Sequence, residues 1–307
     1  MIYTCTINPS LDYYMEYAEP LTSKETNRSQ LEFYEAGGKG INVSIVLNNM
    51  MVPSRAFGFL GGFTRHFFIE LLQKYEYIQP SFTYIDGHTR INVKIRANGE
   101  ETDLNAAGPY ITPQNMETLR KKVERLDEND TFVFSGNCPE YILDDICSMI
   151  DELLVCNVRV ILDTNATIIN RCIANKPFLI RINIDDLQKI AGKTLKDEQA
   201  ILQAMEECVA KGAQNIIVQL GDEGAIFVNK DGAYKSDAPQ KDKIVNTVGS
   251  ADSMVAGFVV NYNRSRDAVD SFKFANCCKA ATTFSKGFGT REKINELYQA
   301  IQIQKLK

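Results

Sequence analysis

Short apolar runs alternate with longer amphipathic segments along this chain of 307 residues. The runs at 131–134, 158–162 and 216–218 predict strands, because they are short and rich in β-branched or aromatic residues. The segments 142–155 and 201–211 predict helices, since their apolar residues recur at helical spacing. The repeated order of strand, helix and strand predicts an α/β fold with a mostly parallel central sheet covered by helices on both faces.

Two segments depart from this rhythm, at about 11–35 and about 83–105. Polar and apolar residues alternate in Thr89-Arg90-Ile91-Asn92-Val93-Lys94-Ile95, and a period of two indicates half-exposed strands. The pattern alone fits a small separate sheet and a solvated edge hairpin equally well. The alternation places Arg90, Asn92 and Lys94 on one face, where the arginine can hold phosphate oxygens in a bidentate fork.

Polar residues and a glycine lie where the predicted strands end. Asp163 follows the run at 158–162, Gly221 follows the run at 216–218, and Asn183 lies near another strand end. Ligands of parallel sheets bind beyond the carboxyl ends of the strands. We therefore expect these three residues to share one cleft.

Charge and cysteine content narrow the range of functions. A net charge of −5 argues against a nucleic-acid or membrane-surface partner, since both favour clustered positive charge. Eight cysteines without a Cys-x-x-Cys pair, and only two histidines, indicate buried thiols of a reducing cytoplasm rather than a metal site. No apolar stretch reaches the roughly 20 residues of a membrane span. We expect one cytoplasmic domain over residues 1–307 that acts on a small molecule.

The segment 246–258 combines an anion-binding helix start with a carboxylate. Small residues lead through Gly249 and Ser250 to Asp252, which opens an apolar helix. Free N–H groups at a helix N-terminus bind anions, and the carboxylate can accept a proton from an attacking hydroxyl. The helix dipole should also favour ionised Asp252 and keep its pKa low. An ordinary helix cap explains these residues too, but a second glycine-rich helix start at 36–44 favours a shared ligand.

These two segments resemble the paired signatures of the PfkB (ribokinase-like) carbohydrate kinases. Further matching pieces lie in order along the whole chain: Asn8-Pro9-Ser10-Leu11-Asp12, Gly58-Phe59-Leu60-Gly61-Gly62, Thr89-Arg90-Ile91-Asn92-Val93-Lys94, Leu220-Gly221-Asp222-Glu223-Gly224-Ala225 and Gly289-Thr290-Arg291-Glu292. The first and third pieces are most similar to the 1-phosphofructokinase and tagatose-6-phosphate kinase branch. The resemblance implies a three-layer α/β/α sandwich in which the strands of 11–35 and 83–105 form a small lid sheet.

The resemblance also implies a reaction, transfer of the γ-phosphoryl group of ATP to a hydroxyl of fructose 1-phosphate or tagatose 6-phosphate. Asp252 would be the base, and the backbone amides of Gly249, Ser250, Ala251 and Asp252 would form the anion hole. The implied substrate-binding residues are Asp12, Gly38, Lys39, Gly40, Asn42, Arg90, Lys94 and Asn137. Asn137 stands where relatives carry a serine that faces the substrate.

On the nucleotide side, the resemblance implies that Asn183, Gly221, Gly224 and Asn276 bind ATP. Asp186 replaces the glutamate that organises Mg²⁺ through water, an exchange that keeps the oxygen ligands this ion prefers. Ala251 replaces a glycine, which would be strained at a positive φ and harmless within the first helical turn. Ile182 and Arg65 also differ from the usual pattern.

Two other functions are compatible with the sequence. The altered anion hole fits a catalytically weak sensor that binds nucleotide or sugar phosphate, although the retained Asp252 and Asn183 argue against it. A nucleoside kinase of the same fold would leave Arg90 and Lys94 without a phosphate to bind. The half-exposed strand residues Ile91 and Val93 suggest a homodimer through the lid.

Overall fold

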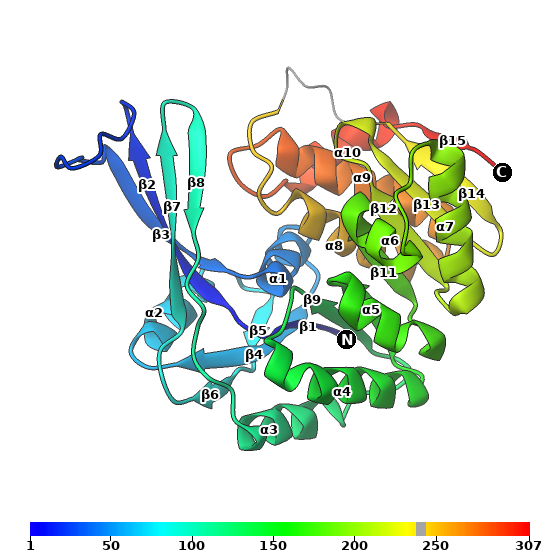
Figure 1. Cartoon of the computed structure of the whole chain (residues 1–307), viewed down its shortest axis with the longest axis horizontal. Helices are drawn as coiled ribbons and strands as arrows, with labels where there is room; N and C mark the ends of the chain where they lie inside the picture. Colours follow the sequence, from blue (N-terminus) through cyan, green and yellow to red (C-terminus); the bar gives the residue numbers. More distant parts are fainter. Residues whose placement is uncertain (238–243) are drawn as a thin grey trace.

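The computed structural model describes residues 1–237 and 244–307. In these residues a large sheet lies between two layers of helices, and a small sheet stands apart at one side (Figure 1). The strands of the large sheet are, in spatial order, β15 (Ile303–Lys305), β14 (Gly232–Ser236), β13 (Ala225–Asn229), β12 (Asn215–Gln219), β11 (Leu179–Asn183), β10 (Arg159–Asp163), β9 (Thr131–Ser135), β1 (Ile2–Thr6), β4 (Ser54–Gly61) and β5 (Ile78–Pro80), with β6 (Thr83–Ile85) also paired to β4. The strands from β12 to β5 are parallel, and β13, β14 and β15 form an antiparallel edge.

Helices cover both faces of the large sheet. One face carries α3 (Pro113–Val123), α4 (Leu143–Val155), α5 (Ala166–Cys172), α6 (Ile184–Ala191) and α7 (Glu198–Lys211), with the short 3₁₀ helices η1 (Glu140–Ile142) and η2 (Ile173–Asn175) beside them. The other carries α1 (Lys39–Asn49), α8 (Ser250–Ser265), α9 (Ala268–Thr283) and α10 (Arg291–Ala300). A further 3₁₀ helix, η3 (Gly221–Glu223), follows β12. Successive residues of β10 enter different cores, Val160 and Leu162 on one side and Ile161 on the other, which explains the continuous apolar run.

The small sheet has the order β3 (Leu31–Gly37), β2 (Ser10–Tyr17), β7 (Arg90–Ala97) and β8 (Glu100–Leu104). Its register places Asn92 and Glu35 on either side of Asp12, so one face gathers polar groups. Helix α2 (Thr64–Leu72) packs beneath it through Phe68 and shares an apolar cluster with Leu11.

The predicted α/β fold is confirmed, and so are the strands and helices expected between residues 131 and 218. One assignment within 83–105 is wrong. Strand β6 pairs with β4 and joins the large sheet instead of the small one. It lies beside the second half of β4, whereas β5 lies beside the first half of the same strand. The action of the small sheet as a lid stays a prediction.

Six of the eight cysteines are buried, and all eight are free thiols. Cys156, at the end of α4, is the exposed exception to the expected pattern. Within the described part of the chain, none of the helices has the length and apolar character needed to cross a bilayer.

Candidate active site

Two helices on the same face of the large sheet begin at a glycine with positive φ. Gly38 precedes α1 with φ 127° and Gly249 precedes α8 with φ 71°, and neither N-terminus receives a side-chain cap in the described structure. A side chain at Gly249 would also collide with the ring of Phe288, 2.2 Å from the position of the missing Cβ. By contrast, Thr112, Asn183 and Asp197 cap their helices with side-chain oxygens. The N–H groups of α1 and α8 thus remain available to a ligand.

The two helix starts meet through one hydrogen bond. Asn42, in the first turn of α1, donates from Nδ2 to Oδ2 of Asp252 at 2.7 Å. Asp252 lies in the first turn of α8 and is only 4% exposed. Its second oxygen, Oδ1, has no hydrogen-bond partner among the described residues. A buried carboxylate oxygen without a partner is costly, so it marks a position where a hydroxyl group is expected to bind.

The amides at the start of α8 differ slightly from the expected anion hole. The N–H of Ser250 donates to the carbonyl of Thr247 at 3.2 Å, so it is already engaged in a turn. The amides of Gly249, Ala251 and Asp252 make no such bond within the described residues. Ala251 is the second residue of α8 and is absent from the residues with positive φ, so replacement of a glycine costs nothing there.

Burial and, to a smaller extent, the charge of nearby Asp163 raise the pKa of Asp252 to about 6, against smaller opposite effects of Asn42, Lys39 and Arg181. The expectation of a low pKa from the helix dipole was therefore wrong. Desolvation of the charged carboxylate outweighs the dipole because the side chain is almost completely removed from water. The result is a carboxylate that is ionised at neutral pH and still able to accept a proton.

A buried charge cluster lies near Asp252 at the ends of the central strands. Asp163, the last residue of β10, accepts a hydrogen bond from Nη1 of Arg181 at 3.0 Å and lies 3.8 Å from Nζ of Lys39. Its Oδ2 and the hydroxyl of Ser135 have no partners in the described structure. Since buried polar atoms are normally paired, these free atoms indicate a ligand at this edge of the sheet.

A pocket of about 200 Å³ lies between the small sheet, α1 and the loops around residues 246–248 and 286–288. Asp12 faces it, held by hydrogen bonds to its Oδ1 from Ser10 at 2.7 Å and Asn92 at 3.0 Å. Burial is the main cause that raises the pKa of Asp12 above its usual value. The polar residues that line the pocket are Asp12, Glu35, Asn42, Asn49, Arg96, Asn246 and Lys286. Acceptors and cations of this kind suit a polyhydroxylated anion.

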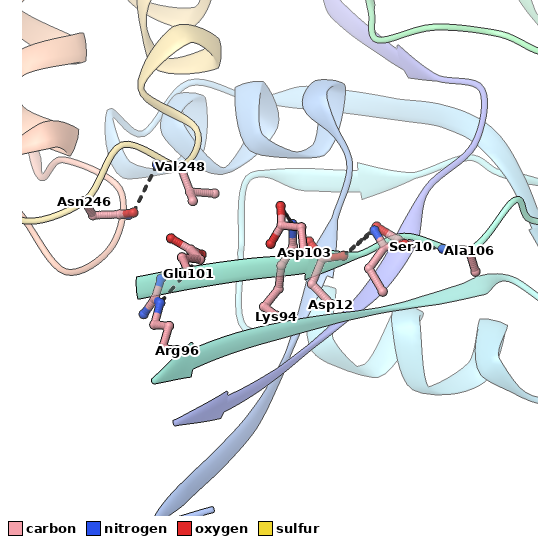
Figure 2. A network of polar contacts seen from close by, with 10 residues as sticks. Ser10, Asp12, Lys94, Arg96, Glu101, Asp103, Ala106, Asn246 and Val248 are labelled. Carbon is pink, nitrogen blue, oxygen red and sulfur yellow. Dashed lines mark hydrogen bonds and ion pairs between the residues drawn. The ribbon is translucent and has the colours of Figure 1, made fainter. Parts of the chain in front are cut away.

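Figure 2 shows how the polar residues of the small sheet are connected. Lys94 is bonded to Asp103 of the neighbouring strand β8, which partly neutralises its charge. Arg90 donates to two backbone carbonyls, those of Asn8 at 3.0 Å and Ala106 at 3.1 Å. The structure thus fixes Arg90 at the base of the sheet and pairs Lys94, while Lys39 remains half-exposed at the start of α1.

The residues assigned to the nucleotide lie along the carboxyl ends of β11 and β12. Asn183 ends β11 and caps α6 by accepting from the N–H of Asp186 at 2.8 Å. Gly221 and Gly224 frame the turn after β12, where the N–H of Leu220 donates to the carbonyl of Gly224. As expected, Asp163, Asn183 and Gly221 all lie at strand ends of one edge.

Two further residues that the sequence assigned to the site are Asn276 and Asn137. Asn276 is buried in α9 and donates to the carbonyl of Phe272 in the preceding turn, so its oxygen is the group left to a ligand. Asn137 is exposed just beyond β9, next to Gly136, whose N–H donates to the carbonyl of Asp163.

Protein ligands alone do not form a cage for a metal ion here. In the described residues, no three His, Cys, Asp or Glu side chains lie close enough to hold one. Asp186 and the unpaired Oδ2 of Asp163 instead offer single oxygens near the nucleotide side. This arrangement fits Mg²⁺, which keeps several waters and binds largely through phosphate oxygens.

Sequence reasoning missed several charged groups of the site. Arg96 continues the alternation of Arg90 and Lys94, so extending that pattern by one step would have found it. Lys286 and Glu35 reach the pocket from distant loops and strands. Nothing in their local sequence distinguishes them from ordinary surface charges.

Comparisons with known proteins agree on one family. The profile of the pfkB family carbohydrate kinase matches residues 6–294. The 1-phosphofructokinase of Borreliella burgdorferi is 35% identical over 99% of this chain and 98% of its own. The D-tagatose-1-phosphate kinase of Bacillus licheniformis is 31% identical over the full length of both chains. A crystal structure from Staphylococcus aureus, 35% identical, superposes with a TM-score of 0.88 over 100% of this chain and 99% of that one.

Proposed function

The chain belongs to the pfkB carbohydrate kinase family and is a sugar-phosphate kinase with an alcohol group as acceptor, and we propose that it transfers the γ-phosphoryl group of ATP to a ketohexose 1-phosphate. The observation that carries this proposal is the buried Asp252 at the uncapped start of α8, hydrogen-bonded to Asn42. One helix start supplies free amides for phosphate, and the carboxylate beside them supplies a proton acceptor. Asn42, the hydrogen-bond partner of Asp252, and Val248, which precedes Gly249, line a polar pocket of about 200 Å³.

In the proposed reaction, Asp252 accepts the proton of the attacking sugar hydroxyl through its unpaired Oδ1. The hydroxyl oxygen forms a bond to the γ-phosphorus, the bond from that phosphorus to the bridging oxygen breaks, and ADP leaves. The amides of Gly249, Ala251 and Asp252 stabilise the charge on the transferred group. Because the transition state is loose, proton transfer is needed late, and a base with a pKa of about 6 suffices.

The phosphate that the substrate already carries needs cations that bind it at the far side of the pocket. We assign Arg90, whose guanidinium is held in place by two carbonyls, and the missed residues Arg96 and Lys286. Lys94 contributes less to binding of the substrate phosphate, because Asp103 already pairs with it. Lys39 acts closer to the reaction, since it is near enough to lower the pKa of Asp252. Asp12, Asn42 and the amides around Gly38 and Gly40 bind sugar hydroxyls, with Asn137 at the rim.

Both named relatives act, by their names, on a ketohexose 1-phosphate. This favours fructose 1-phosphate, phosphorylated at its remaining primary hydroxyl, over tagatose 6-phosphate. D-Tagatose 1-phosphate differs from fructose 1-phosphate only in the configuration at C4, so hydrogen bonds to a single hydroxyl separate these two candidates.

The family implies ATP as the phosphoryl donor. We propose that Asn183, Gly221, Gly224 and the Asn276 oxygen hold the nucleotide and that Asp186 holds Mg²⁺ through water. When bound, Mg²⁺ would neutralise part of the charge of the nucleotide phosphates.

We also propose a homodimer through the outer face of the small sheet. Tyr34, Ile91 and Leu104 lie on this face with exposures of 38%, 39% and 54%. Exposed apolar groups grouped on one sheet face favour association. Ile91→Asp should convert a dimer to monomer in light scattering, while Val155→Asp, an exposed position on α4, should not. A wild-type monomer would overturn the dimer.

The test of function is ADP release from Mg-ATP with fructose 1-phosphate, D-tagatose 1-phosphate, tagatose 6-phosphate, fructose 6-phosphate, free sugars and adenosine in parallel. Turnover of one ketohexose 1-phosphate that disappears in Asp252→Asn is the expected result. Asp144→Asn, an exposed carboxylate on α4, serves as the matched control and should keep full activity. Nucleotide binding without turnover of any acceptor would refute the kinase and favour a sensor, and turnover of adenosine would favour a nucleoside kinase.

A further inference from the structure

Lys279 is a buried cation that the mechanism above does not use. It lies in the C-terminal part of α9, four residues before the last residue of the helix, and is 9% exposed. In the part of the chain that the structure describes, no acidic side chain forms an ion pair with its ammonium group. A buried ammonium is stable only when another group compensates its charge. Its position therefore requires an explanation.

The charged group that acts on Lys279 is itself a cation. Arg181 of β11 lies close enough to lower the pKa of Lys279. The guanidinium of Arg181 donates to Asp163, and the same carboxylate oxygen lies near Lys39. One buried carboxylate thus serves two other cations, and Lys279 adds a further positive charge. The cluster has the composition of an anion site.

The acidic groups named below, on described elements near α9, form no ion pair with Lys279. Asp252 of α8 accepts from Asn42. On α10, Glu296 pairs with Lys293, and on β14, Lys235 pairs with Glu198 of α7. None of these described groups neutralises Lys279.

The position of Lys279 along α9 indicates which anion it meets. Asn276, Lys279 and Thr283 are spaced three and four residues apart and share one face of the helix. The carbonyl of Thr283 accepts from the N–H groups of Val245 and Asn246 at 2.8 and 3.1 Å, which anchors the segment that leads to Gly249. With a rise of about 1.5 Å per residue, Lys279 lies about 4.5 Å along the axis from Asn276 and about 6 Å from Thr283.

A nucleotide whose base lies near Asn276 and whose γ-phosphate reaches the start of α8 would carry its phosphates past Lys279. The sugar-phosphate pocket lies elsewhere, because its lining contains neither Lys279 nor Arg181. We propose that Lys279 binds the phosphates of the nucleotide, an assignment that rests on the proposed kinase function. Lys279 supplies a charge-assisted hydrogen bond from beneath the triphosphate, next to Arg181.

The protonation of Lys279 gives this proposal a direct signal. Burial, followed by the charge of Arg181, lowers the pKa of Lys279 to about 8. A bound phosphate would restore the charged form and raise this pKa. Nucleotide binding at a pH of about 8 should therefore take up about half a proton per molecule.

The experiment is calorimetric titration of MgADP into wild-type protein, Lys279→Met and Lys279→Gln, in buffers of different ionisation enthalpy at pH 8. A charge-assisted hydrogen bond corresponds to a loss of about tenfold or more in MgADP affinity for both variants. The proton uptake of the wild type should vanish in both, and the KM for the sugar phosphate should stay within about twofold. Lys273→Met is the matched control on the same helix and should bind MgADP like the wild type, since Lys273 packs over the ring of Tyr298.

The outcomes separate this inference from the proposed function. Wild-type turnover together with unchanged MgADP affinity in Lys279→Met overturns the role of Lys279 and leaves the kinase intact. Absence of proton uptake by the wild type also overturns it. A wild-type protein that neither binds MgADP nor turns over any sugar phosphate overturns both.

Discussion

Replacing Lys279 by methionine should stabilise the protein in the absence of nucleotide. Methionine keeps the volume of the lysine stem and removes a charge that burial disfavours. Folding lowers the pKa of Lys279 from its ordinary 10.5 to about 8. At about 1.4 kcal/mol for each tenfold change in proton affinity, this corresponds to about 3 kcal/mol at neutral pH.

The sign of the pH dependence follows from the protons held by each state. Between about pH 8 and 10.5, the unfolded chain retains the Lys279 proton and the folded chain releases it, so the free energy of unfolding rises with pH. Below that pH window the folded state carries the full cost of burying the charged ammonium of Lys279. The advantage of Lys279→Met should therefore be largest at about pH 7 and should shrink as the pH approaches 10.5.

Urea unfolding followed by circular dichroism, for wild type and variant in parallel, measures this difference. Lys273→Met provides the control, because Lys273 lies on the same helix at its partly exposed surface. Its free energy of unfolding should change by less than about 0.5 kcal/mol, as is usual for a surface substitution. A Lys279→Met protein that is no more stable than wild type at neutral pH would refute the inference that the buried charge of Lys279 is uncompensated.

Three further predictions concern the reaction. The kcat/KM for the sugar phosphate should rise with pH through about 6 and then level off, because Asp252, with its raised pKa of about 6, must be ionised; a flat profile from pH 5 to 8 would contradict its role as base. Asp163→Asn should move this acid limb to lower pH, because Asp163 raises the pKa of Asp252, and an unmoved limb in the rate profile would count against that coupling. Gly249→Ala should lower kcat at least about tenfold and destabilise the protein by about 1–2 kcal/mol, since its φ is 71°; the exposed control Asp144→Asn on α4 should leave the rate unchanged.

Local patterns were sufficient to predict much of the fold. The helices α4 and α7 follow from the helical spacing of their apolar residues, and the strands β9, β10 and β12 follow from short runs rich in β-branched and aromatic residues. Strand β6 has only three residues and pairs with the edge of β4. The local sequence of β6 does not indicate which strand it pairs with.

The pKa values and ion pairs of the site residues depend on contacts between distant segments, which the sequence alone does not reveal. The helix start at Asp252 was visible as a pattern, but its pKa is set by burial and by Asp163 on a different strand. Lys94 was expected to be free for a phosphate, and the β7–β8 register places Asp103 opposite it. In the sequence, Lys279 does not differ from an ordinary helix lysine, because the charge that acts on it belongs to Arg181, far earlier in the chain.

The hydrogen bond between Asn42 and Asp252 joins residues 210 positions apart. At synthesis rates of about 5–20 residues per second, the chain that contains α8 leaves the ribosome about 10–40 s after α1. During that interval α1 and the small sheet can form, whereas the proton acceptor does not yet exist. Recovery of activity in refolding should therefore lag behind recovery of helical signal, because contacts of high sequence separation form slowly. Catalysis in this protein becomes possible only when the N-terminal and C-terminal parts of the chain have docked.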